Sequence, residues 1–308
     1  MKILVFGAGA IGCFYGAAMA LAGSEVTLYL RNSKRADIIT ENGLALRYLD
    51  GRNERRSHPE VCGDLAALGG YDLALLAVKA YDTEQAAAQL SSVPGDFPVL
   101  ILQNGLADGK RLSAYFASRR LLPTVIYEGA RLANDNTVIC AGSGSTIVTA
   151  AAEEGVLTAC KTVKFMKNCG LEACFAARSD FPRFLWEKLI VNSVINPLTA
   201  VNNVVNGRVL ADKKLSCQAR KLAEEGVAVA NSLGISLDMD RIWQALQDTC
   251  KRSFGNRSSM LEDITHGRPT EIRQINGAIV DAGRQKGIAT PLNEEMRRKI
   301  IEMSLIAG

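Results

Sequence analysis

A glycine-rich loop between a strand pattern and a helix pattern constrains this fold more than any other feature. Residues 2–6 (KILVF) have the pattern of a buried strand, residues 11–22 have helical periodicity, and GAGAIG at 7–12 fits GxGxxG between them. In such a unit the glycines allow a tight turn, close approach of a pyrophosphate and close helix–strand packing, and the helix N-terminus faces the phosphates. The spacing predicts a dinucleotide site, against the alternative of a purely structural glycine turn. The predicted contacts are Gly7, Ala8, Gly9, Ala10, Ile11 and Gly12.

The first half of the chain continues this alternation of strands and helices. Apolar runs at 26–30, 73–78 and 98–102 are too dense for strands with one exposed face, and 82–92 has a helical pattern. Strands buried on both faces are typical of a parallel sheet covered by helices. We therefore predict an α/β fold in which residues 1–178 form a doubly wound, Rossmann-type NADP-binding domain. Three strand-like pieces within 120–175 (LLPTVIY, NTVICAG and STIVTA) are expected at the far edge of its sheet.

The second half has mostly helical periodicity from Phe181 onward. We place the boundary close to Ser179 and predict a C-terminal all-helical domain over 179–308 that holds the substrate and the catalytic group. A chain of 308 residues is long enough for two such units. The expected helical segments lie around 183–200, 211–233, 240–251, 258–265 and 270–286.

Composition excludes several classes of protein. A net charge of +4, scattered along the chain, does not predict nucleic-acid binding. Eight cysteines without a CxxC motif, and only two histidines, predict reduced thiols and no metal site. The chain has no charged-then-apolar leader and no apolar run of about 20 residues, so we expect a cytoplasmic protein without membrane contact. The sequence leaves monomer and homodimer open.

Arg31 follows the second apolar run, where an NAD-binding chain carries Asp or Glu for the ribose hydroxyls. A carboxylate would repel a 2′-phosphate, whereas a guanidinium binds one by donating two hydrogen bonds. Lys34 and Arg35 add positive charge nearby. The sequence therefore predicts NADP(H) as cofactor; an ordinary surface arginine that caps a loop is the alternative.

Two more polar side chains directly follow apolar strands. Lys79 comes after the run 73–78, and Asn104 comes just after 98–102. Ligands of doubly wound folds bind beyond the carboxyl ends of the strands, so both residues are predicted at the cofactor site. The alternative for each is a solvated loop residue or, for Asn104-Gly105, a turn former.

A polar stripe runs along an otherwise apolar helix pattern in FLWEKLIVNSVINPLTA. Lys188, Asn192, Asn196 and Thr199 fall within an arc of about 80° at 100° per residue. Burial of a lysine lowers its pKa toward the range useful for proton transfer. Pro197 lacks an amide N–H and is expected to free a carbonyl for the site. The alternative is a snorkelling lysine above an amide network between helices.

Further along the chain, Ser258 or Ser259 precedes a helix pattern, and Glu271 falls in the expected first turn of the next one. The residues alone favour an N-cap for the serines and a dipole-matched acid for Glu271.

As a set, these residues resemble the ketopantoate reductase (2-dehydropantoate 2-reductase) family over essentially the whole chain. The motifs that carry the resemblance are GAGAIG, Arg31, AVKAYDT, LQNG, WEKLIVNSVINPLTA with Asn206-Gly207, NRSSML and GRPTEIRQING. The last three are not shared by dinucleotide-binding domains in general. The resemblance implies hydride transfer from NADPH to the ketone of a branched 2-oxo acid, giving pantoate for pantothenate and coenzyme A synthesis.

The resemblance also implies roles for particular residues. Lys188 matches the family's proton donor and also contacts the substrate. The further substrate contacts that it implies are Asn192, Asn196, Asn206, Asn256 and Ser259. The further cofactor and active-site contacts are Arg31, Lys79, Asn104, Glu271 and, through its backbone, Ala130.

Segments 123–128 and 139–150 depart from the family pattern as we expect it, which leaves the identity of the 2-oxo acid open. One alternative is an NADPH-dependent reductase of a different branched 2-oxo acid. A second is a non-enzymatic NADP sensor, which would not need a buried lysine beside asparagines. A flavin-binding protein would be expected to carry an acid near position 31.

Overall fold

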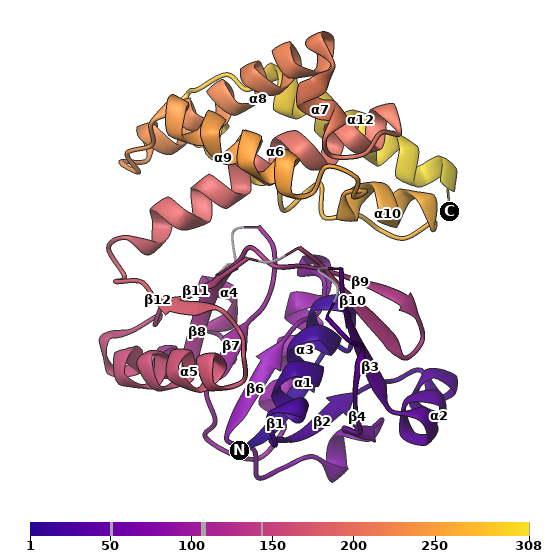
Figure 1. Cartoon of the computed structure of the whole chain (residues 1–308). Coiled ribbons are helices and arrows are strands. Elements are labelled where there is room, and N and C mark those ends of the chain that lie inside the picture. The colour runs from indigo at the N-terminus through magenta and orange to yellow at the C-terminus, as the bar shows by residue number, and fades with distance from the viewer. Residues whose placement is uncertain (50–51, 106–108, 143, 308) are drawn as a thin grey trace. The chain divides into compact units, whose positions relative to one another are not determined.

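The computed structural model describes residues 1–49, 52–105, 109–142 and 144–307 and divides the chain into two compact units (Figure 1). The first unit runs from Met1 to Ser179, apart from the short segment beginning at Asn104. That segment groups with the second unit, which otherwise begins at Asp180.

The first unit is built on a mainly parallel sheet. Among the described residues its strand order is β12-β11-β8-β7-β6-β1-β2-β5. β5, β2, β1, β6, β7 and β8 are parallel, and β11 pairs antiparallel with β8. This confirms the predicted α/β fold with an N-terminal parallel sheet. The strands are β1 (Lys2–Phe6), β2 (Glu25–Tyr29), β5 (Glu60–Cys62), β6 (Leu73–Leu76), β7 (Val99–Ile101), β8 (Leu121–Ile126), β11 (Thr146–Val148) and β12 (Ala173–Phe175).

Both faces of this sheet are buried, as the dense apolar runs predict. Ile3 and Val5 of β1 pack into the core that contains α1, whereas Leu4 and Phe6 pack into the core that contains α3. The alternation follows from the two-residue period of a strand. The helices and short 3-10 turns of this unit are α1 (Ala10–Leu21), α2 (Ser33–Asn42), η1 (Leu65–Ala67), η2 (Ala80–Asp82), α3 (Thr83–Ser91), α4 (Gly109–Leu112), η3 (Ser118–Arg120), η4 (Glu153–Gly155) and α5 (Val156–Asn168).

A second sheet packs against the other side of α1, and it corrects one expectation. Its strand order is β4-β3-β10-β9, and α1 contacts all four of these strands. The piece NTVICAG, expected at the edge of the main sheet, instead forms β10 between β3 and β9. The sequence pattern of this segment does not distinguish the two sheets, because a buried apolar residue such as Val138 is expected in a strand of either sheet. These strands are β3 (Leu44–Tyr48), β4 (Arg55–Ser57), β9 (Gly129–Asn134) and β10 (Thr137–Gly142).

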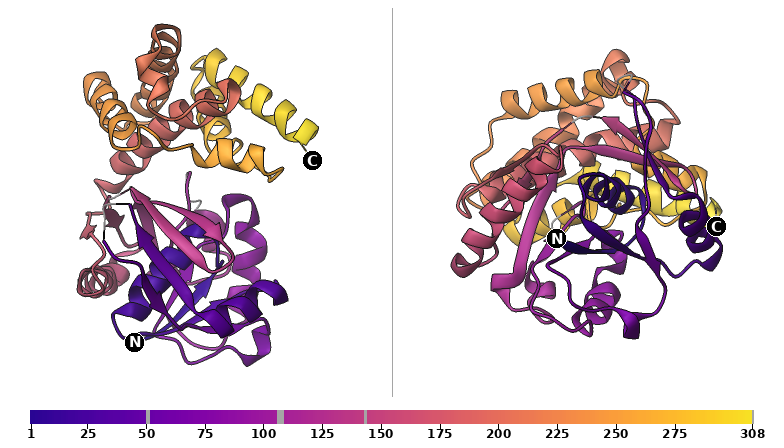
Figure 2. Two further views of the ribbon diagram at one scale, coloured as in Figure 1. Left: turned by 45° about the vertical axis from the view of Figure 1, so that its right-hand side comes forward. Right: turned by 60° about the horizontal axis from the view of Figure 1, so that its bottom comes forward.

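The second unit is helical and centred on α6, which contacts α8, α9, α10 and α12 (Figures 1 and 2). Most of α6 is buried, as expected for a helix that is apolar nearly all round. The sequence did not predict α12. The helices are α6 (Phe181–Asn202), α7 (Arg208–Ala211), α8 (Lys213–Ser232), α9 (Met239–Arg252), α10 (Ser259–Thr265), α11 (Asn276–Lys286) and α12 (Pro291–Ala307).

The helix expected over 270–286 begins six residues later, at Asn276. Ile275 has φ −104° and ψ −87°, which are not helical, and the amides of Gln274 and Ile275 donate to the carbonyl of Glu271 in a turn. Ile272 and Ile275 are both buried in the core of the second unit. Glu271 therefore lies in a packed turn, and the expectation that it occupies the first turn of a helix was wrong.

Within the described parts of the chain, no helix has the length and apolar character needed to cross a membrane.

Candidate functional site

The glycine loop has the geometry that close approach of a phosphate requires. Gly7 has φ +108°, and a Cβ there would lie 2.6 Å from the Val78 amide nitrogen. A Cβ on Gly12 would lie 2.1 Å from the Gly7 carbonyl oxygen, so only glycine lets the helix pack this close to the strand. In contrast, nothing lies within 4 Å of the position of a Cβ on Gly9. The backbone at Gly9 therefore faces open space at the N-terminus of α1.

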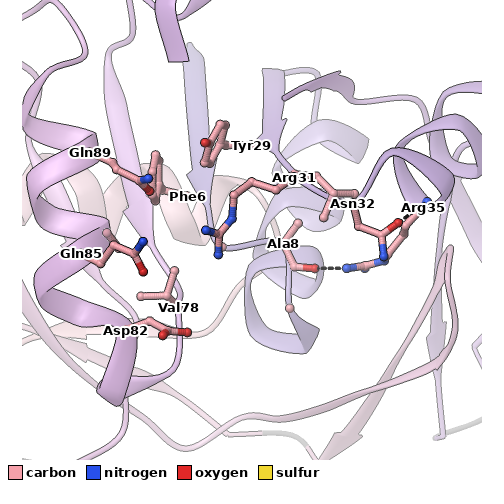
Figure 3. Close-up of a pocket in the computed structure, with 14 residues that line it drawn as sticks. Phe6, Ala8, Tyr29, Arg31, Asn32, Arg35, Val78, Asp82, Gln85 and Gln89 are labelled. Atoms are coloured by element: carbon pink, nitrogen blue, oxygen red, sulfur yellow. Dashed lines mark hydrogen bonds between the residues drawn. The ribbon is translucent and has the colours of Figure 1, made fainter. Parts of the chain in front are cut away.

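A pocket of about 330 Å³ adjoins this loop in the first unit (Figure 3). It is lined by Phe6 and Tyr29, whose rings stack with centroids 4.5 Å apart. Figure 3 shows the Arg31 guanidinium directed into the pocket, opposite Gln85 of α3. Further lining residues are Gly7, Ala8, Gly9, Leu30, Asn32, Arg35, Val78, Asp82, Ala86 and Gln89.

The two arginines of this pocket have different environments. Arg35 donates hydrogen bonds to the carbonyls of Ala8 and Asp135 and to the Cys13 sulfur, so it anchors the glycine loop to the turn between β9 and β10. Arg31 is exposed and forms no hydrogen bond or ion pair with any residue that the structure describes. Its guanidinium is therefore available for an anionic ligand.

The polar residues after β6 and β7 lie at the ends of neighbouring strands. Lys79 is half-buried and precedes the short turn η2. Gln103 is 7% exposed and donates to Val78 O at 3.0 Å and Thr83 Oγ1 at 2.9 Å, which holds the turn that contains Lys79. Asn104 belongs to the second unit by its contacts, and its Nδ2 donates to Glu271 Oε2 at 3.3 Å.

The polar stripe predicted on the long helix lies on α6. Lys188 and Asn192 are half-buried, Asn196 is 7% exposed and Thr199 is fully buried. Thr199 Oγ1 lies 2.6 Å from Ser258 Oγ, which connects the end of this stripe to the start of α10.

Ser258, and not Ser259, is the N-cap of α10. Ser258 is buried and its Oγ accepts from Leu261 N at 3.1 Å. Ser259 is the exposed first residue of the helix. The structure therefore gives the capping role to Ser258 and leaves the Ser259 side chain accessible.

Pro197 frees a carbonyl in α6, but a side chain of the protein donates a hydrogen bond to this carbonyl. The expectation that the freed carbonyl serves the substrate site is therefore corrected. A proline at 197 leaves Ser193 O without its helical donor. Asn276 Nδ2, fully buried at the start of α11, donates to Ser193 O at 2.9 Å and to Asn293 Oδ1 at 2.9 Å. The sequence signal for Asn276 was the proline itself, since a buried carbonyl without a helical partner needs a donor from elsewhere.

Asn206 and Asn256 are brought together by two paired loops. The Asn206 amide donates to Asn256 O at 2.9 Å, and the Gly207 amide donates to Phe254 O at 3.0 Å. Asn206 is 8% exposed. Both asparagines are predicted from the sequence, but no sequence motif points to Ser253, whose Oγ accepts from Asn206 Nδ2 at 3.0 Å.

A buried polar group near Ala130 was also missed. Ala130 lies in β9, opposite Cys140 of β10. Two residues earlier, the Glu128 carboxyl lies 3.2 Å from Thr146 Oγ1, which in turn lies 2.6 Å from the Tyr15 hydroxyl on α1. Burial raises the pKa of Glu128, although hydrogen bonds from Thr146 and Tyr15 oppose it. Burial and the neighbouring Glu128 also raise the pKa of Tyr15. In the atypical segment 139–150, residue 143 lies outside the described residues.

The described residues contain no group of three or more His, Cys, Asp or Glu placed to hold a metal ion.

Comparison with known proteins identifies the family. Residues 3–153 match the family described as ketopantoate reductase PanE/ApbA, and residues 180–303 match its C-terminal part. A 2-dehydropantoate 2-reductase from Archaeoglobus fulgidus is 32% identical over 298 residues, covering 96% of this chain and 95% of the relative. One from Halobacterium salinarum is 30% identical and covers 95% of both chains.

Solved structures show the same fold. A PanE/ApbA family ketopantoate reductase from Ralstonia eutropha JMP134 superposes with a TM-score of 0.89 at 27% identity, covering 100% of this chain and 99% of the other. D-mandelate dehydrogenase, in a ternary structure with NADH and anilino(oxo)acetate, has a TM-score of 0.91 at 24% identity and covers 100% of this chain and 99% of its own. Together with the sequence matches, these likenesses show that the chain belongs to the ketopantoate reductase family of nicotinamide-dependent oxidoreductases.

Proposed function

We propose that this protein reduces 2-dehydropantoate (ketopantoate) to pantoate with NADPH, a step of pantothenate and coenzyme A biosynthesis. The names of its relatives support the reaction. The observation that carries the proposal is the polar face of α6, where Lys188, Asn192 and Asn196 lie on a helix that is otherwise apolar and buried. A lysine beside amides, on a polar face whose far end reaches the buried Ser258 through Thr199, is suited to a carboxylate substrate that gains a proton.

The first unit fits a dinucleotide that carries a 2′-phosphate. The open backbone at Gly9 and the free amides of α1 suit a pyrophosphate. Arg31 directs an unpaired guanidinium into the adjoining pocket, where a 2′-phosphate would accept two charge-assisted hydrogen bonds. We therefore propose residues 1–178 as the NADP-binding domain and NADPH rather than NADH as the preferred form of the cofactor. By resemblance to the family, Lys79, Asn104 and Glu271 are assigned as further cofactor and active-site contacts, and the backbone of Ala130 as a contact on the nicotinamide side.

The residues of the second unit supply the proton and orient the substrate. When bound, NADPH supplies the hydride that the ketone carbon accepts. Negative charge then grows on the carbonyl oxygen, and Lys188 donates a proton to that oxygen. The amides of Asn192 and Asn196 orient the 2-oxo acid, and the accessible Ser259 hydroxyl binds its carboxylate. Asn206 and Asn256 bind the rest of the substrate from the paired loops.

The test is oxidation of NADPH on addition of ketopantoate, with Lys188→Ala and Lys188→Arg as variants. We expect turnover by the wild type and a loss of kcat of about 10²- to 10⁴-fold in Lys188→Ala, the range for a general acid. Lys188→Arg keeps the charge but holds its proton too tightly to restore the rate. NADPH binding, measured by fluorescence, should be the same in all three proteins.

Other outcomes of this assay would contradict the proposal in distinct ways. Turnover of other branched 2-oxo acids, but not of ketopantoate, would move the protein to a different substrate. NADPH binding without reduction of any 2-oxo acid, unaffected by Lys188→Ala, would indicate a sensor of the cofactor.

A further inference from the structure

Two loops of the second unit are locked together beside the predicted substrate residues. The loop after α6 and the loop after α9 pair through the backbone bonds from Asn206 to Asn256 and from Gly207 to Phe254. The Phe254 ring fills the place of a Cβ on Gly207, because its Cδ2 atom lies 2.2 Å from that position. Asn206 is therefore held in a fixed position, not on a free loop.

The hydroxyl of Ser253 determines which way the Asn206 amide faces. Ser253 Oγ donates its single proton to the Thr249 carbonyl, 2.7 Å away, one turn back in α9. With that proton used, the same oxygen can only accept a hydrogen bond from the Asn206 side chain, whose amide lies 3.0 Å away. The Asn206 atom that faces Ser253 must then be the donor, Nδ2, and the carbonyl oxygen Oδ1 must face the other way.

Asn206 Oδ1 is buried and has no hydrogen-bond partner among the described residues. A buried carbonyl oxygen without a donor is costly, so such an atom points to a donor supplied by a ligand. A ketone or a carboxylate only accepts hydrogen bonds and cannot meet this need. A hydroxyl on the substrate's side chain can.

Asn206 is paired through its backbone with Asn256, another residue predicted to bind the substrate. Asn256 is two residues before Ser258. The Ser258 hydroxyl lies 2.6 Å from Thr199 Oγ1 and 3.5 Å from Asn196 O, on the polar stripe of α6.

We propose that Ser253 is a positioning residue that turns the Asn206 carbonyl toward the substrate, so that the site selects a 2-oxo acid whose side chain carries a hydroxyl donor. The inference rests on the proposed reduction of a 2-oxo acid and specifies its substrate class. Ketopantoate has such a hydroxyl, and 3,3-dimethyl-2-oxobutanoate is the same molecule without it.

The experiment measures kcat/KM for these two substrates in the wild type, Ser253→Ala and Ser253→Thr. The wild type should prefer the hydroxylated substrate by roughly 10- to 100-fold, the effect of one hydrogen bond left unmade at a buried acceptor. In Ser253→Ala the amide is no longer oriented, and the preference should fall by about tenfold, through a higher KM for ketopantoate. Ser253→Thr keeps the hydroxyl and should restore the preference.

A double-mutant cycle with Asn206→Ala separates positioning from general damage. Once Asn206 is gone, Ser253→Ala should cause no further loss of preference, because its effect passes through that amide. Additive losses in the cycle, or an equal fall for both substrates in Ser253→Ala, would overturn the inference. Equal kcat/KM for both substrates in the wild type would also overturn it while leaving 2-oxo acid reduction intact. Reduction of neither would instead overturn the proposed function.

Discussion

Pro197 and Asn276 are complementary across the core of the second unit: the proline leaves the Ser193 carbonyl without a helical donor, and the asparagine side chain supplies one at 2.9 Å. The same Asn276 Nδ2 donates to Asn293 Oδ1, and Asn293 Nδ2 donates to Glu225 Oε2 at 2.7 Å. α6 is thereby joined to α8, α11 and α12 by a buried polar chain. The helix that carries Lys188 is thus fixed at its C-terminal half by hydrogen bonds as well as by apolar packing.

Asn276→Ala should lower the free energy of unfolding by about 2 kcal/mol or more, because it leaves two buried acceptors, Ser193 O and Asn293 Oδ1, without this donor. Both tryptophans of the chain, Trp186 and Trp243, lie in the second unit, so their fluorescence in urea reports this unit.

The proline provides the matched control. Pro197→Ala returns an amide N–H to α6, so it should recover part of the loss when combined with Asn276→Ala, with a coupling of about 1 kcal/mol. Strictly additive effects would show that Ser193 O is not the shared partner.

Gly9→Ala should leave the fold unchanged and weaken cofactor binding. The new Cβ meets no protein atom within 4 Å, but it enters the space beside the helix N-terminus that we assign to the pyrophosphate. We expect an unchanged Tm and a KM for NADPH raised by roughly tenfold or more. Gly12→Ala is the contrasting variant, because its Cβ would lie 2.1 Å from Gly7 O, and it should lower the Tm sharply. A Gly9→Ala protein with normal cofactor KM would refute the assignment of the loop.

Arg31→Ala should raise the KM for NADPH by roughly 10- to 100-fold, since a charge-assisted bidentate contact to the 2′-phosphate is lost. The KM for NADH should change by less than about threefold because NADH has no such phosphate. Arg35→Ala is the comparison. Arg35 anchors the Ala8 carbonyl, so its loss should impair both cofactors equally and lower the Tm. Equal effects of Arg31→Ala on the two cofactors would contradict the predicted preference for NADPH.

Glu128→Gln should change how stability depends on pH. Burial raises the pKa of the Glu128 carboxyl above its ordinary value, so the folded protein binds this proton more tightly than the unfolded chain does. Below the ordinary pKa of a glutamate, the protonated carboxyl contributes its full amount to the stability of the fold. This contribution is lost as the pH rises through the pKa that Glu128 has in the folded protein. Glutamine does not ionise, so the variant does not lose this stability as the pH rises.

The measurement is the Tm of both proteins by circular dichroism from about pH 4 to about pH 8. The Tm of Glu128→Gln minus that of the wild type should increase with pH over this range. A difference that stays constant with pH would show that Glu128 keeps an ordinary pKa in the folded protein.

Features that depend on neighbouring residues were predictable from the sequence. The glycine loop, the parallel strands buried on both faces and the polar stripe on α6 follow from spacing along the chain, because the strand period of two and the helix period of 3.6 are local. Arg31 was identifiable for the same reason, since its place two residues after the end of β2 is a matter of order along the chain.

Only the tertiary structure decided which distant residues pair with each other. The placement of β10 in a second sheet, the bond from Asn276 to Ser193 and the bond from Asn206 to Ser253 join segments that no local period relates. The last two span 83 and 47 positions. A sequence pattern indicates that a buried carbonyl or amide needs a partner, because an unpaired one is costly. Which side chain meets that need depends on how the helices pack, and so the orientation of the Asn206 amide was decided only by the folded protein.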